Sequence, residues 1–167
     1  MTGKWNEPDW AKDGNEAVRF FYWFSRFEYA LKMAGYTKPD QENAEPDWDG
    51  FANKELGKAF FNNIEAGPTA DILFKEAPRK QIVLSDGKLG WCPEAPDFPV
   101  RPDSIQSLMG FLCRVRNNLF HGGKAPGCLE GRDKELIMAA QCVLEQALEK
   151  SPSEVQEAFK NPSDSHG

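Results

Sequence analysis

The chain has 167 residues, a formal net charge of −6 and a sequence pI of about 5.0. With 40% hydrophobic residues, this length supports one well-buried core and is short for two independent ones, so we expect a single domain. The acidic balance argues against a protein that coats nucleic acid through bulk electrostatic attraction. Any nucleic acid would have to be bound locally, at a defined site.

The apolar runs are too short for a membrane span. Phe20 to Phe24, one of the longest, is followed by Ser25 and Arg26, whereas a membrane-spanning helix needs about 20 apolar residues. Residues 1–7 lack the apolar core of a secretory signal. We therefore expect a cytoplasmic protein without a membrane segment.

The cysteines form no CxxC pair and have no cluster of histidines beside them. They are Cys92, Cys113, Cys128 and Cys142. This spacing does not favour a structural zinc site, and we predict neither a metal nor a cofactor. Four cysteines could form two disulfides, but Cys113 and Cys142 fall in segments predicted as helices, where a small buried thiol is the commoner role. We therefore expect reduced, inert thiols.

Residues 1–14 are predicted as an N-terminal tail, which is either free or docked on the body as a strip. A helix is expected from Asn15, a suitable N-cap, to about Gly35. At about 100° per residue, one broad face of this helix is apolar. That face consists of Phe20, Trp23, Phe24, Phe27, Ala30, Leu31 and Ala34. The aromatic run from Phe20 to Phe24 extends beyond it, which predicts further burial by another helix or another subunit.

A second helix is expected from about Asp49 to Glu65, ended by Gly67-Pro68, with a short helical turn from 69 to 75. Its predicted inward residues are Leu56, Ala59, Phe60 and Ile64. Residues 81–84 and 88–91 flank Asp86-Gly87, which accepts the positive φ of a tight turn and therefore predicts a β-hairpin. Four prolines between 93 and 102 exclude regular structure up to Asp103. We treat 79–102 as an insertion.

Two further helices are expected, from about Ser104 to Phe120 and from about Asp133 to Lys150, because apolar residues recur in both every three or four positions. Together the four helices of residues 15–150 suffice for a bundle. Residues 151–167 are predicted as a C-terminal tail with a short helix near 154–159. The expected fold is therefore mainly α, an up-and-down helical bundle with a small β-hairpin insertion.

One arginine lies on the apolar side of the third predicted helix. The apolar residues of this helix fill an arc of roughly 160°, and Arg116 falls close to its middle. An unpaired charge there would cost several kcal/mol, so Arg116 must meet a carboxylate, a ligand or a solvated cleft. On the first helix, Glu28 lies just inside the edge of the aromatic face. We therefore expect Arg116 and Glu28 to form a supporting ion pair.

His121 ends the same helix, directly before Gly122-Gly123, which supply the left-handed conformations that stop a helix. One interpretation is that His121 only complements the negative helix C-terminus. In an ideal helix, residues five apart lie about 140° apart, so Arg116 and His121 would not converge on one small ligand. A two-fold partner or an unwound last turn would bring them together.

The segment from Arg116 through Asn117 to His121 resembles the motif of the HEPN family. Proteins of that family are helical bundles with an R-x4-6-H motif near the end of one long helix, usually with a polar residue straight after the arginine. Here Asn117 takes that position, and a further long helix follows. The resemblance covers residues 15–150, but only the motif is specific, and the insertion at 79–102 has no counterpart in the minimal bundle.

The resemblance implies a metal-independent endoribonuclease, in which the RNA 2′-hydroxyl attacks the adjacent phosphorus. His121 would then be the general base or acid, Arg116 would stabilise negative charge on the phosphoryl oxygens, and Asn117 would orient the ribose or phosphate. Gathering two sets of these residues would require a homodimer. The family also includes non-catalytic members that bind nucleotides or a partner, such as a nucleotidyltransferase or an antitoxin. A plain helical adaptor, in which the Arg116–Glu28 pair is only structural, is the third alternative.

Overall fold

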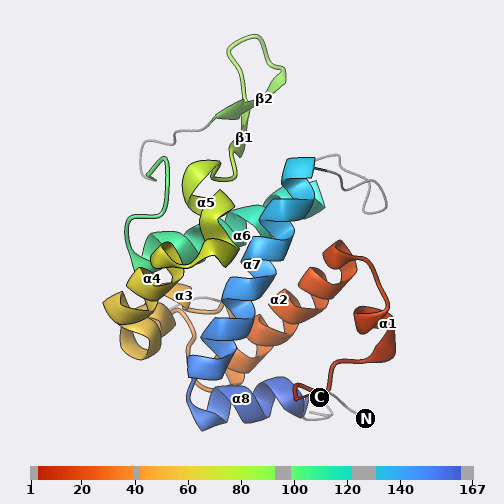
Figure 1. The fold of residues 1–167 in the computed structure, drawn as a ribbon, viewed down its shortest axis with the longest axis vertical. Coiled ribbons are helices and arrows are strands. Elements are labelled where there is room, and N and C mark those ends of the chain that lie inside the picture. Colours follow the sequence, from red (N-terminus) through yellow and green to blue (C-terminus); the bar gives the residue numbers. More distant parts are fainter. Residues whose placement is uncertain (1–3, 40–41, 93–98, 122–130, 163–167) are drawn as a thin grey trace.

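The computed structural model describes residues 4–39, 42–92, 99–121 and 131–162, without the side chain of His121. These residues are mainly helical and include one two-stranded antiparallel hairpin, which confirms the predicted class (Figure 1). None of the described helices is long and apolar enough to cross a membrane. Cys128 lies outside the described residues.

Helix α2 (Glu16–Met33) forms the centre of the core. The side chain of Asn15 accepts a hydrogen bond from Val18 N at 3.1 Å and so caps the helix, as predicted. The chain leaves the helix at Gly35, whose φ of +85° requires a residue without a Cβ. The predicted inward face is buried from Phe20 to Leu31, and Ala34 is partly buried.

The second predicted helix is interrupted. Its residues form α3 (Trp48–Phe51), a π-helical segment η1 (Ala52–Leu56) and α4 (Gly57–Ala66). Gly57 has a φ of +67° where the π segment ends. Because a π turn and a left-handed residue rotate the following positions, the regular 100° pattern fails here. Ala59, expected inside, is exposed, whereas Phe60, Phe61 and Ile64 are buried.

The next segment leads into the hairpin. It contains η2 (Pro68–Ala70) and α5 (Asp71–Lys75), where a helical turn was predicted. Strands β1 (Lys80–Val83) and β2 (Leu89–Cys92) pair antiparallel, with Lys80 opposite Cys92. Gly87 takes a φ of +80° in the turn, as the Asp-Gly sequence predicts. In Figure 1 the hairpin projects from the helical body at the top.

Helices α6 (Ile105–His121) and α7 (Gly131–Lys150) complete the body. Ser104 caps α6, since its Oγ accepts a hydrogen bond from Ser107 N at 3.2 Å. In Figure 1, α7 runs from top to bottom, α6 passes behind it and α2 runs obliquely beside it. Leu108, Met109 and Val143 are among the fully or almost fully buried residues of this region.

Both ends of the described chain pack on α2. The amino-terminal segment includes α1 (Asp9–Lys12), and the carboxy-terminal segment includes α8 (Ser153–Lys160), close to the short helix predicted there. The ring centroids of Trp5 and Phe159 lie 6.1 Å apart, and the ring of Trp23 on α2 lies 4.9 Å from that of Phe159. Of the two alternatives for the amino terminus, the docked strip is therefore the one observed for residues 4–13.

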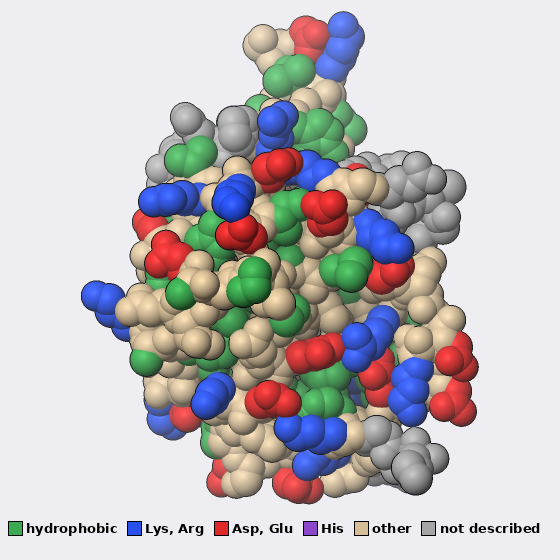
Figure 2. Space-filling model, viewed as in Figure 1, with side chains coloured by type: hydrophobic (Ala, Val, Ile, Leu, Met, Phe, Trp, Pro, Cys, Tyr) green, Lys and Arg blue, Asp and Glu red, His purple; other side chains and the backbone are tan. Residues whose placement is uncertain are grey.

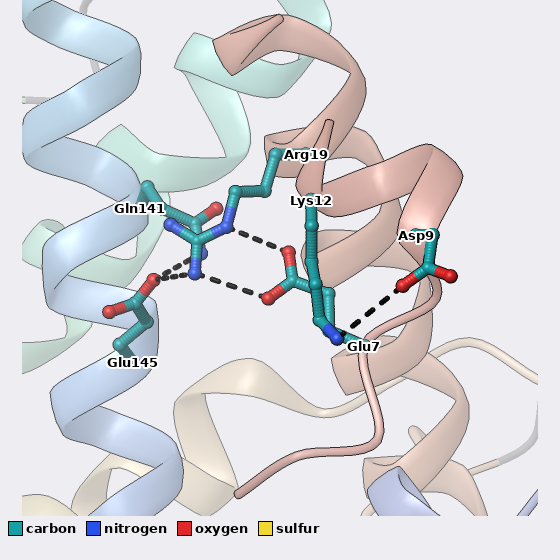
Figure 3. Close-up of polar contacts among 6 residues, drawn as sticks. All are labelled: Glu7, Asp9, Lys12, Arg19, Gln141 and Glu145. Carbon is teal, nitrogen blue, oxygen red and sulfur yellow. Dashed lines mark hydrogen bonds and ion pairs between the residues drawn. The ribbon is translucent and has the colours of Figure 1, made fainter. Parts of the chain in front are cut away.

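A charged cluster holds the amino-terminal strip in place (Figure 3). Arg19 on α2 donates to Glu7 from Nε at 2.7 Å and pairs with Glu145 on α7 through Nη2 at 2.9 Å. Burial alone would lower the pKa of Arg19, but the two carboxylates raise it above its usual value. Gln141 donates to Glu145 at 2.8 Å, so the strip, α2 and α7 share one polar network.

Candidate functional site

The carboxy-terminal half of α6 positions the arginine of the predicted motif. Arg116 Nη2 lies 3.2 Å from Glu28 Oε1 on α2, so the expected ion pair is present. The side chain of Arg116 is 32% exposed and that of Glu28 is 23% exposed. The pair is therefore mostly buried near the surface, and Arg116 Nε is itself buried without a hydrogen-bond partner among the described residues.

Aromatic side chains fix both members of the pair. Trp48 Nε1 donates to Glu28 Oε1 at 3.3 Å, and the guanidinium carbon of Arg116 lies 4.9 Å from the centroid of the Phe24 ring. One helical turn earlier on α6, burial raises the pKa of the Cys113 thiol to about 11, against the opposing effect of the Arg116 charge. Cys113 is therefore a neutral thiol at ordinary pH and takes no part in the charge balance.

The structure describes the position of only one of the other two motif side chains relative to Arg116. Asn117 is exposed and, as the next residue on the helix, is turned about 100° from it. His121 is the last residue of α6, but its side chain lies outside the described part of the chain, as do Gly122 and Gly123. The predicted catalytic group is thus located at the helix end without a described side-chain geometry.

Two exposed phenylalanines lie between α2 and α6. The ring centroids of Phe21 and Phe120 are 5.2 Å apart, and these residues are 45% and 50% exposed. Phe120 follows Arg116 by four residues and therefore lies near the same face of α6. The aromatic excess predicted for the first helix thus leaves an exposed aromatic pair beside the motif.

The base of the hairpin is fixed to α6 and α7 in a way that the sequence did not predict. Four consecutive backbone carbonyls, those of residues 76–79, accept hydrogen bonds from helix side chains. Arg132 on α7 donates to the first two at 2.8 and 2.9 Å. On α6, Arg114 donates to Pro78 O at 3.3 Å and Asn118 donates to Arg79 O at 2.7 Å. The only sequence signal was the spacing of Arg114 and Asn118, which places both on one side of α6.

A cavity of about 170 Å³ lies beside these anchors, between α6, α7 and the hairpin. Its described lining does not include Arg116 or Asn117. It consists of Pro78, Arg79, Trp91, Val115, Asn118, Leu119, Arg132, Asp133, Leu136 and Ile137. Figure 2 shows basic and hydrophobic side chains next to one another around the base of the hairpin. The cavity therefore combines an apolar interior with cationic, acidic and amide groups.

Metal-ligating residues do not gather in the described part of the chain. Across residues 4–39, 42–92, 99–121 and 131–162, no three His, Cys, Asp or Glu side chains are placed to hold one ion. The candidate site is therefore described by its arginine, amide and aromatic side chains.

Comparison with known proteins gives no relative for this chain. No protein-family model matches it, and no curated protein and no solved structure matches it either. Function has to be inferred from the geometry of the site and from the motif.

Removing either member of the Arg116–Glu28 pair should lower the free energy of unfolding by about 1–3 kcal/mol, because a half-buried charge loses its partner. The double change Arg116→Ala, Glu28→Ala should cost less than the sum of the two single changes. Urea unfolding of the four proteins measures this coupling. The exposed pair Lys38–Glu45 is the matched control, with an expected coupling of about 0–1 kcal/mol. Additive losses at Arg116 and Glu28 would contradict the interaction.

Proposed function

We propose that the protein is a cytoplasmic, metal-independent endoribonuclease of the HEPN class, built on a HEPN-like up-and-down helical bundle. The observation that carries the proposal is the position of Arg116: a partly exposed cation, held by Glu28 and Phe24, in the last turns of the helix that ends at His121. Transfer of the RNA phosphoryl group requires a fixed positive charge of this kind. His121, five residues after Arg116, is the proton-transfer group of the motif.

The proposed reaction needs only the chain's own residues. His121 removes the proton of the RNA 2′-hydroxyl, and that oxygen forms a bond to the adjacent phosphorus. The bond from phosphorus to the 5′-oxygen breaks, and that oxygen takes up a proton from water, which leaves a 2′,3′-cyclic phosphate and a 5′-hydroxyl. The protonated His121 then returns its proton to water. Arg116 stabilises the negative charge on the phosphoryl oxygens, and Asn117 donates a hydrogen bond to the ribose or phosphate.

The direct test is cleavage of RNA by the purified protein in the presence of EDTA. We expect cleavage to continue, and the same sequence as DNA to survive, because DNA lacks the 2′-hydroxyl that acts as nucleophile. Products should carry cyclic phosphate ends, which mass spectrometry can identify. Cutting that EDTA abolishes, or cutting of DNA, would refute the mechanism, since a metal-activated water attacks either backbone.

We further propose that the protein acts as a two-fold homodimer, so that two sets of motif residues share one cleft. The exposed rings of Phe21 and Phe120 beside Arg116 favour this, because a partner would cover them. Light scattering should report about twice the 18.8 kDa mass of the chain. Phe120→Glu should shift the protein towards the monomer, whereas Met33→Glu, on a distant exposed residue of α2, should not. A wild-type monomer at micromolar concentration would contradict the dimer.

The second candidate is a non-catalytic HEPN module that binds a nucleotide or a partner protein, such as a nucleotidyltransferase or an antitoxin. One observation favours it: Glu28 offsets the charge of Arg116, which weakens its attraction for a phosphate. This candidate predicts that wild-type protein leaves diverse RNAs intact while still binding its ligand.

A further inference from the structure

The base of the hairpin is hydrogen-bonded to the helix that carries the motif and to α7. Three side chains of α6 and α7 donate to the carbonyls of residues 76–79, and none of these bonds depends on the tip of the hairpin. Trp91 on β2 lies opposite Gln81 on β1, two residues after Arg79 in the chain. The pairing of the two strands therefore fixes Trp91 near the base of the hairpin. A side chain at Trp91 is therefore placed with respect to α6 by a continuous set of hydrogen bonds.

The cavity at this base has the composition of a site for an unpaired nucleobase. Its volume of about 170 Å³ far exceeds the roughly 10–15 Å³ that a single water needs. Val115, Leu136 and Ile137 are buried and form an apolar floor, and Trp91 is 40% exposed and lines the wall. A half-exposed aromatic ring over an apolar floor accepts the flat face of a base.

Cationic and amide groups complete the cavity. Arg79 is exposed where it lines the cavity, and Arg132 lies beside it with its guanidinium anchored on the carbonyls of residues 76 and 77. Asp133 also lines the cavity and Arg132 pairs with Glu76 at 3.4 Å, so the charge around the cavity is mixed. The amide of Asn118 donates to Arg79 O, and its oxygen is an acceptor for a base N–H.

We propose that this cavity binds one unpaired base of a single-stranded RNA substrate, with the base stacked on Trp91 and a neighbouring phosphate on Arg79. The inference rests on the proposed function and makes the hairpin the substrate-selecting part of the same site. Asn118 follows Arg116 by two residues, about 3 Å along the helix axis. The two residues lie about 200° apart around α6, so an RNA that contacts both must pass around the helix.

The test is binding of a fluorescent single-stranded RNA with 2′-O-methyl riboses, which cannot be cut because the nucleophile is blocked. Fluorescence anisotropy with the full chain should show that Trp91→Ala weakens binding about tenfold or more. Trp91→Phe should retain most of the affinity because it keeps a stacking ring. Leu89→Ala, on the same strand, 67% exposed and outside the described cavity lining, is the matched control and should bind like wild type. The same RNA as a duplex should bind more weakly than the single strand.

A second readout separates this inference from the proposed catalysis. With cleavable RNA, Trp91→Ala should raise KM and leave kcat unchanged, because the base is bound equally in the ground state and the transition state. Binding that depends on Trp91 in a protein that never cuts RNA would support the cavity and refute the catalysis. Cleavage with unchanged KM in Trp91→Ala, equal losses in Leu89→Ala, or no binding of single-stranded RNA by wild type would each overturn the cavity assignment.

Discussion

His121→Ala is expected to lower RNA cleavage by about 100-fold or more, the lower end of what a positioned general acid or base contributes. The helical fold should be unchanged, because His121 is the last residue of α6. Single-turnover cleavage of a short RNA in EDTA measures the effect, and circular dichroism checks the helices. Full activity in this variant would refute the role of His121.

The effect of replacing Arg116 has to be compared with that of replacing Glu28, because Arg116 also forms an ion pair with Glu28. Arg116→Ala should lower cleavage by about 100-fold or more as well, but it also leaves Glu28 without its cationic partner. Glu28→Gln separates the two roles: it removes the opposing charge while the amide oxygen can still accept from Trp48 Nε1. If Arg116 acts on the phosphate, Glu28→Gln should cut RNA at least as well as wild type. Equal losses in both variants would show that the pair is only structural.

Phe159→Ala on α8 should lower the free energy of unfolding by about 3–5 kcal/mol, the usual cost of removing a buried phenylalanine ring. Phe159 is fully buried, and its ring lies within 6.1 Å of Trp5 and 4.9 Å of Trp23. The change would leave a cavity between the two terminal segments and α2. Urea unfolding monitored by circular dichroism gives the value.

A matched control for this cost is Met33→Ala. Met33 is a large apolar residue of α2 that is 54% exposed, so its truncation should change the free energy of unfolding by no more than about 0.5 kcal/mol. Phe159→Leu should lie between the two, because it keeps part of the buried volume. Similar values for Phe159→Ala and Met33→Ala would show that α8 does not belong to the cooperative core.

The long regular helices of this chain could be predicted because their apolar periodicity is local. Asn15 and Gly35 mark the ends of α2 with side-chain and backbone chemistry that acts within a few residues. The interruption at Gly57 could not be predicted, since a π segment leaves the apolar spacing almost intact while it rotates the residues of α4 about the helix axis. Ala59 was placed inside for that reason, and it is exposed.

One part of the candidate site could be predicted from the sequence and another could not. Arg116 and Glu28 could be paired because each stands out as a charge on the apolar side of its own helix. The anchoring of the hairpin base could not be predicted. Arg114 and Arg132 donate to backbone carbonyls of an irregular segment, and because every residue has such a carbonyl, the sequence does not mark which one accepts. Contacts between α2 and the terminal segments also depend on tertiary packing that periodicity does not encode.

The packing of Trp5 against Phe159 has a consequence for synthesis on the ribosome. The aromatic face of α2 is made early, and Trp5 precedes it, but the ring of Phe159 that packs on Trp23 comes from α8, more than a hundred residues later. During this interval the nascent chain exposes the apolar face of α2. Non-local contacts form only when both partners have left the exit tunnel. The growing polypeptide should therefore depend on chaperone shielding until α8 emerges.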